Sequence, residues 1–149
     1  MGSVAVRGSE TTTMQPARVL VVDDSRLVRM VVKSCLRSTG YTVDEAEDGM
    51  AALQLCDARP YDVVVSDLSM PGLDGFGLVK ALGTRRNRPE VILLTGASTL
   101  AEDAAKRGLN LAQHECLSKP PAAPETVILA VERALMKKRT RDLGLQAAA

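Results

Sequence analysis

Aromatic side chains are nearly absent from this chain of 149 residues, which has two tyrosines, one phenylalanine and no tryptophan. Aliphatic residues and methionine must therefore fill the interior, and hydrophobic residues make up 46% of the chain. This composition is ordinary for a globular protein, and it suits strands that are buried on both faces of a sheet. The length favours one domain with a substantial core.

Cysteine and histidine are too few and too scattered for a disulfide framework or a usual zinc site. The three cysteines, Cys35, Cys56 and Cys116, form no CxxC pair, and His114 is the only histidine. We predict buried free thiols in a reducing compartment, with Cys116 filling a gap in the core. A redox sensor at Cys116 is the alternative. His114 is interpreted as a surface residue.

Neither charge nor hydrophobicity points to nucleic acid or a membrane. The formal net charge is +1, so no acidic partner is indicated. No apolar run approaches membrane-spanning length, and the N-terminal stretch lacks the apolar segment of a signal peptide. We predict a cytoplasmic protein. The basic residues at 137–141 are interpreted as a solvated helix end rather than a nucleic-acid contact.

Short apolar runs alternate with helical repeats from Val19 onward. The pattern predicts five strands, at 19–22, 41–46, 63–67, 91–95 and 116–118. It also predicts five helices, at 27–36, 50–58, 76–82, 100–112 and 127–135. This alternation predicts an α/β fold, a doubly wound parallel sheet with right-handed crossovers. Residues 1–16 are expected to be a disordered leader, 17–141 the domain, and 142–149 a short tail that is disordered or not native.

Polar side chains follow four of the predicted strands. Asp23 and Asp24 follow the first, Asp67 ends the third, Thr95 ends the fourth, and Lys119 follows the fifth. Because the active site of such a sheet lies at the carboxyl ends of its strands, these groups are expected to meet there. Adjacent carboxylates are stable together only if they are protonated, or if a divalent cation and a nearby lysine neutralise them. Oxygen ligands alone favour Mg²⁺. An aspartate in that setting can accept a phosphoryl group.

Four short segments of the sequence match motifs of one protein family. They are 21–25 (VVDDS), 67–75 (DLSMPGLDG), 93–96 (LLTG) and 117–120 (LSKP). Together, in this order and at strand ends, they make residues 18–139 resemble the receiver domains of two-component response regulators. The resemblance implies the flavodoxin-like, or CheY-like, strand order 2-1-3-4-5.

The resemblance also implies a role for each site residue. Asp67 would be the phosphoacceptor, Lys119 would pair with it, and Thr95 would move its hydroxyl to the phosphate. Asp23, Asp24, Asp67 and the backbone carbonyl of Ser69 would hold Mg²⁺. The phosphoryl group would come from a histidine kinase or a histidine phosphotransfer protein. No turnover of a separate substrate is expected, because neither a capping insertion nor a second acid–base carboxylate for a phosphohydrolase is evident.

One departure from the family pattern concerns the output. The family usually has Tyr or Phe three residues before the lysine, where this chain has Cys116. The resemblance implies a target protein on the face formed by the fourth helix, fifth strand and fifth helix, and Met136 with Leu143 suggests a homodimer contact. The alternative is an interaction module that does not need phosphorylation. Few residues follow the domain, so a stand-alone regulator or the excised receiver of a longer protein is expected.

Overall fold

The computed structural model describes residues 15–96, 105, 108, 114–119, 121 and 123–144. Within these ranges there are five strands and four helices. The strands are β1 (Arg18–Val22), β2 (Thr42–Ala46), β3 (Val63–Asp67), β4 (Glu90–Thr95) and β5 (Glu115–Ser118). The helices are α2 (Arg26–Arg37), α3 (Gly49–Ala58), α4 (Gly75–Gly83) and α6 (Pro124–Asp142).

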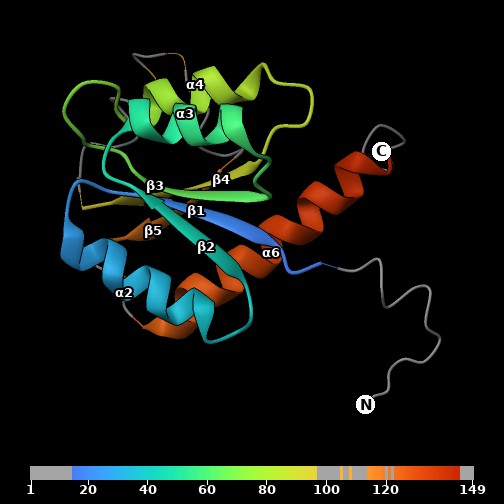
Figure 1. Cartoon of the computed structure of the whole chain (residues 1–149), viewed down its shortest axis with the longest axis horizontal. Coiled ribbons are helices and arrows are strands. Elements are labelled where there is room, and N and C mark those ends of the chain that lie inside the picture. The colour runs from blue at the N-terminus through green and yellow to red at the C-terminus, as the bar shows by residue number, and fades with distance from the viewer. Residues whose placement is uncertain are drawn as a thin grey trace.

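All five strands are parallel, and they lie in the order β2-β1-β3-β4-β5. Helices α3 and α4 cover one face of this sheet, and α2 and α6 cover the other (Figure 1). The predicted fold class and strand order are therefore confirmed. The predicted helix at 100–112 lies outside the described residues except for Ala105 and Gly108, as do residues 1–14 and 145–149.

The strands are buried because both faces of the sheet are covered. In β1 and β3, successive side chains enter two separate cores. Leu20 and Val64 pack with α3 and α4, whereas Val21 and Val65 pack with α2 and α6. Because these apolar runs are continuous, the strands could be predicted from the sequence.

Helix α2 buries a narrower stripe than its sequence predicted. Ser25 caps it, since the Ser25 hydroxyl accepts a hydrogen bond from the N–H of Val28 at 3.3 Å. Only Val32 and Leu36 are fully buried, while Leu27 and Val31 are exposed. The helical spacing of the apolar residues in this segment predicted one apolar face that included Leu27 and Val31, but both lie outside the part of that face that packs on the sheet.

Two predictions about polar and sulfur side chains are also wrong. Cys116 is exposed and Cys35 and Cys56 are only partly buried, although all three are free. On β5 the alternation of side chains sends Leu117 into the core and leaves Cys116 outside it. The helix end at 137–141 is not simply solvated, because Lys138 is buried and its ammonium lies 3.0 Å from both Asn87 Oδ1 and Asp142 Oδ2.

Helix α6 runs seven residues further than the predicted helix at 127–135 and ends at Asp142. Its C-terminal end extends past the sheet (Figure 1), although Arg141 still pairs with Glu90 at the start of β4. The helices of the described ranges include none that is both long and apolar enough to span a membrane.

Candidate functional site

Three carboxylates meet at the carboxyl ends of the two central strands. Asp23 and Asp24 follow β1, Asp67 ends β3, and each offers an oxygen within 4.8 Å of the others. Asp23 is fully buried, Asp67 is 3% exposed, and Asp24 is exposed. The parallel pairing of β1 with β3 brings these residues together, which confirms the juxtaposition expected from the strand ends.

Lys119 supplies the positive charge of this cluster. Its ammonium lies 2.6 Å from Asp67 Oδ2 and 3.2 Å from Asp23 Oδ1. Its backbone N–H donates to the carbonyl of Thr95 at 3.1 Å, which ties the end of β5 to the end of β4. Burial lowers the pKa of Lys119, but the hydrogen bond from Lys119 to Asp67 and the charges of Asp23 and Asp67 outweigh it and raise the pKa overall.

Asp23 is the most constrained of the carboxylates. Its Oδ1 accepts a hydrogen bond from the Ser25 N–H at 2.8 Å, whereas its Oδ2 is buried without a hydrogen-bond partner among the described residues. Burial raises the pKa of Asp23, and the neighbouring charge of Asp67 adds to that effect. A buried carboxylate oxygen without a donor is costly unless a cation binds it.

The donor set fits a hard divalent cation. Among the described residues, three carboxylates face one ammonium, so the cluster carries excess negative charge, and it includes no thiolate or imidazole. Oxygen ligands and a partly exposed position, here at Asp24, suit Mg²⁺, which keeps several of its waters. The cluster could therefore hold Mg²⁺, with the unpartnered Asp23 Oδ2 as one of the oxygens available to it.

The turn after β3 holds Asp67 in place. The Ser69 N–H donates to Asp67 Oδ1 at 3.1 Å, and Gly75 at the start of α4 packs against the carbonyl of Asp67. A Cβ atom on Gly75 would lie 2.5 Å from that carbonyl oxygen, so only glycine fits there. Asp74 caps α4 by accepting a hydrogen bond from the Gly77 N–H at 3.0 Å.

Arg29 supports the site, although its place in the sequence indicates only the polar face of a helix. Its guanidinium donates to the carbonyl oxygen of Asp23 at 2.7 Å and to Glu45 Oε1 at 2.8 Å. It thereby links the loop that contains Asp23 and Asp24 to the end of β2. The sequence signal was slight: one arginine in the first turns of a helix that follows two aspartates.

The remaining predicted residues lie around this cluster. Thr95 ends β4 beside Ser118, and Ser69 is exposed in the turn that holds Asp67. Cys116 is paired in register with Leu93, nearer the start of β5. The roles assigned to Thr95 and to the Ser69 carbonyl stay predictions. Pro120 lies outside the described residues.

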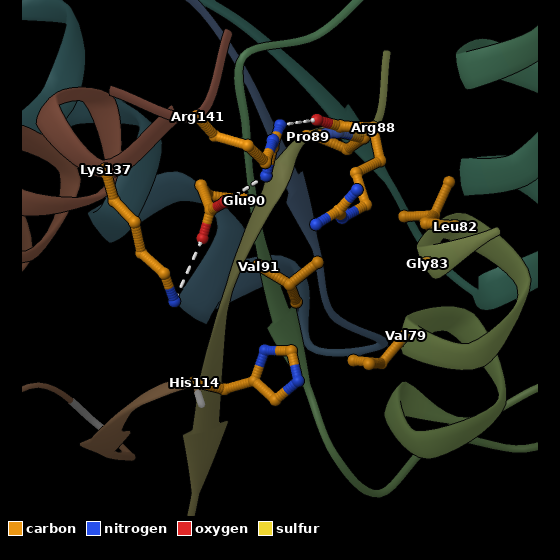
Figure 2. A pocket seen from close by; sticks show the side chains of 10 residues that line it. All are labelled: Val79, Leu82, Gly83, Arg88, Pro89, Glu90, Val91, His114, Lys137 and Arg141. Carbon is orange, nitrogen blue, oxygen red and sulfur yellow. Dashed lines mark hydrogen bonds and ion pairs between the residues drawn. The ribbon is translucent and has the colours of Figure 1, made fainter. Parts of the chain in front are cut away.

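A pocket of about 570 Å³ lies at the other end of β4, away from the acidic cluster. Arg88, Glu90, His114, Lys137 and Arg141 are among its lining residues, and none of the predicted site residues is (Figure 2). His114 is half-buried there rather than on the open surface, and burial lowers its pKa. The chemistry argued above belongs to the strand-end cluster, not to this pocket.

Comparison with known proteins agrees with this geometry. The sequence profile of the response regulator receiver domain matches residues 19–132. The response regulator MprA of Mycolicibacterium vanbaalenii is 38% identical over 129 residues, which cover 87% of this chain and 54% of that protein. The chain thus spans about half the length of that relative.

Two further matches come from other kinds of protein. A protein-glutamate methylesterase/protein-glutamine glutaminase of Myxococcus xanthus is 38% identical over 113 residues, covering 74% of this chain and 32% of that protein. The chemotaxis protein CheY4 of Vibrio cholerae is 31% identical with a TM-score of 0.68, and the match covers 81% of this chain and 100% of that structure. The chain therefore belongs to the response regulator receiver domains of two-component signal transduction.

Proposed function

We propose that this receiver domain accepts a phosphoryl group on Asp67 from a histidine kinase or a histidine phosphotransfer protein, with Mg²⁺ bound beside it. Asp23, Asp24, Asp67 and the backbone carbonyl of Ser69 would hold the ion. The observation that carries the proposal is the convergence of three carboxylates and Lys119 at one edge of the sheet. We assign residues 17–141 to the domain and the cytoplasm to its location.

The chemistry is a substitution at phosphorus. A carboxylate oxygen of Asp67 attacks the phosphorus of a phosphohistidine, a P–O bond forms, and the P–N bond breaks. The phosphohistidine ring carries a proton on its other nitrogen before the attack, so the imidazole takes the electron pair of the P–N bond and leaves as a neutral ring. When bound, Mg²⁺ supplies positive charge to the phosphoryl oxygens. Lys119, already 2.6 Å from Asp67, stabilises the same negative charge from the protein side.

Phosphorylation would then change the affinity for a target protein. Thr95 ends the strand next to Asp67 and is tied through its carbonyl to Lys119, so movement there reaches both β4 and β5. The target would bind the face that includes β5 and α6. The domain would catalyse only its own phosphorylation and dephosphorylation and would turn over no separate substrate.

One observation favours a second candidate, an interaction module that binds its partner without phosphorylation. Cys116 is exposed on β5, where the family usually has a large aromatic side chain that follows the threonine. A thiol has too little surface to report such a movement in the same way. This candidate keeps the fold and predicts equal partner binding by wild type and Asp67→Asn.

Intact-mass spectrometry after incubation with acetyl phosphate and Mg²⁺ tests the proposal. We expect one phosphoryl adduct on the wild type and none on Asp67→Asn or in the presence of EDTA. Asp57→Asn is the matched control, because Asp57 is an exposed aspartate on α3 that pairs with Arg85, and it should be labelled like the wild type. If the phosphate is lost too rapidly to be detected, binding of beryllofluoride, a stable mimic of the phosphoryl group, is measured instead. No adduct together with no beryllofluoride binding would reject the phosphoryl switch and favour the interaction module.

A further inference from the structure

The pocket at the start of β4 has two sides of different chemistry. Its volume of about 570 Å³ lies within the range of about 300–1,000 Å³ that is usual for ligand pockets, so a small organic molecule would fit. Val79 and Leu82 of α4 and Val91 of β4 form its apolar side (Figure 2). Charged side chains from α6 and from the residues around the start of β4 form the other side.

The charged side of this pocket carries more positive than negative charge. Lys137 and Arg141 both pair with Glu90, with 3.4 Å between the Lys137 ammonium and Glu90 Oε1 (Figure 2). Arg88 adds a third cation. Burial lowers the pKa of His114, so its imidazole adds no charge at neutral pH. Among the described lining residues, three cations therefore face one carboxylate, and such an excess of positive charge attracts an anion.

Arg88 is the cation that is available to a ligand. Its side chain is half-buried, and its guanidinium has neither an ion pair nor a hydrogen bond with a described residue. Figure 2 shows this guanidinium turned into the pocket. A partly buried guanidinium without an acceptor is unfavourable, and its planar fork matches two oxygens of a phosphate. A phosphate group carries up to two negative charges near neutral pH, which would balance the excess of two positive charges.

The rest of the pocket indicates that the phosphate carries an organic group. Figure 2 shows the imidazole of His114 and the side chain of Val79 on opposite sides of the space below Arg88. The imidazole has no hydrogen bond with a described residue. An inorganic phosphate beside Arg88 would leave this space to water. An aromatic ring attached to the phosphate would fill it, because one face of the ring can stack on the imidazole and the other can contact apolar side chains.

We propose that this pocket binds a small phosphate monoester with an aromatic body, of the size of a nucleoside monophosphate. Arg88 holds the phosphate, Lys137 and Arg141 add positive charge beside it, and the aromatic body lies against His114 and the apolar side. The pocket shares no lining residue with the cluster of Asp23, Asp24, Asp67 and Lys119, so this site goes beyond the proposed phosphoryl switch.

Titration of the full chain with AMP, followed by two-dimensional ¹H–¹⁵N NMR in EDTA, tests both the binding and its place. We expect half-saturation at about 0.1–1 mM, with the largest shift changes at the amides of Gly83, Val91 and His114. Inorganic phosphate and adenosine should each bind at least about tenfold more weakly, because each lacks one part of the ligand. No change at these amides up to about 10 mM AMP would overturn the proposal, and so would equal affinities for AMP and inorganic phosphate.

Two charge variants with opposite expected effects test how the phosphate is held. Arg88→Gln should weaken AMP binding at least about tenfold. Arg86→Gln is the matched control and should bind like the wild type, because Arg86 is exposed in the same loop and does not line the pocket. Glu90→Gln should strengthen binding about threefold, since it removes the only carboxylate among the described lining residues.

The opposing interpretation is that these charges only anchor α6 to the sheet. It predicts that AMP binds Arg88→Gln and the wild type equally, and that result would contradict the proposal. The NMR spectrum of each variant shows at the same time that it is folded. Asp67→Asn should bind AMP like the wild type, so this test and that of the phosphoryl switch can fail separately.

Discussion

The ammonium of Lys119 lies 2.6 Å from Oδ2 of Asp67, although the two residues are 52 positions apart in the chain. Their contact depends on the pairing of β3 with β4 and of β4 with β5. It joins the residue proposed to take the phosphoryl group to the cation proposed to stabilise it. The same contact is therefore expected to affect both the stability of the domain and the proposed phosphoryl transfer.

Removing the charge of Lys119 should separate folding from phosphoryl transfer. We expect Lys119→Gln to fold and to accept a phosphoryl group from acetyl phosphate at least about tenfold more slowly, a loss of about 1.4 kcal/mol or more in the transition state. The rate of adduct formation by intact mass measures this. Lys80→Gln, an exposed residue of α4, is the control and should react like the wild type.

The raised pKa of Lys119 gives the same pair a pH dependence. A base whose pKa is raised by folding stabilises the protein below its ordinary value of 10.5, and this contribution is lost as the pH rises through the folded value. As the pH rises above 10.5, the free energy of unfolding should therefore fall more for the wild type than for Lys119→Gln. Identical alkaline melting curves for the two proteins would contradict the pairing.

Asp23→Asn should stabilise the protein when magnesium is absent. Burial raises the pKa of Asp23 above its ordinary value of 3.8, so folding disfavours the ionised carboxylate. The wild type therefore loses stability as the pH rises from 3.8 through the folded pKa, whereas the asparagine does not. Thermal melts in EDTA should show the variant melting higher at neutral pH, with the difference vanishing in acid. With Mg²⁺ the order should reverse, because the variant loses a ligand.

Gly75→Ala should destabilise the fold at the site, since its Cβ would lie 2.5 Å from the carbonyl oxygen of Asp67 and 2.8 Å from Cα of Leu68. Both atoms belong to backbone that cannot rotate away. We expect a loss of about 1–3 kcal/mol in urea unfolding, together with slower phosphoryl acceptance. Gly83→Ala is the control at the other end of α4, where no atom lies within 4 Å of the added Cβ. It should be neutral or stabilising by up to about 1 kcal/mol, so equal losses would refute the steric argument.

Glu45→Gln should weaken the ion pair that orients Arg29, which in turn holds the carbonyl of Asp23. Hydrogen bonds from Lys33 and Arg29 hold the pKa of Glu45 below its ordinary value of 4.5. An acid with a lowered pKa contributes stability above that value, and the contribution is lost as the pH falls through the folded pKa. Because 34% of the Glu45 side chain is exposed, we expect less than about 1 kcal/mol at neutral pH. Urea unfolding along a pH series measures this, with the exposed Glu47→Gln as a neutral control.

Much of the site was predictable because its residues follow buried apolar runs. Val19–Val22 and Val63–Val65 stand out locally, and the aspartates that follow them must reach the same edge of a parallel sheet. The strand order came from the family resemblance instead. No local pattern specifies which strands are neighbours, because hydrogen bonds between strands leave little trace in either sequence.

Local sequence patterns thus predict the alternation of strands and helices and place the carboxylates, the threonine and the lysine at the strand ends. Which helix faces are covered depends on how the fold packs, and this packing leaves Leu27 exposed, buries Lys138 and brings Arg29 to the carbonyl of Asp23. It also left Cys116 outside the core. The physical reason is that burial and ion pairing depend on residues brought near by the fold, whereas helical and strand periodicity depend on neighbours in the chain.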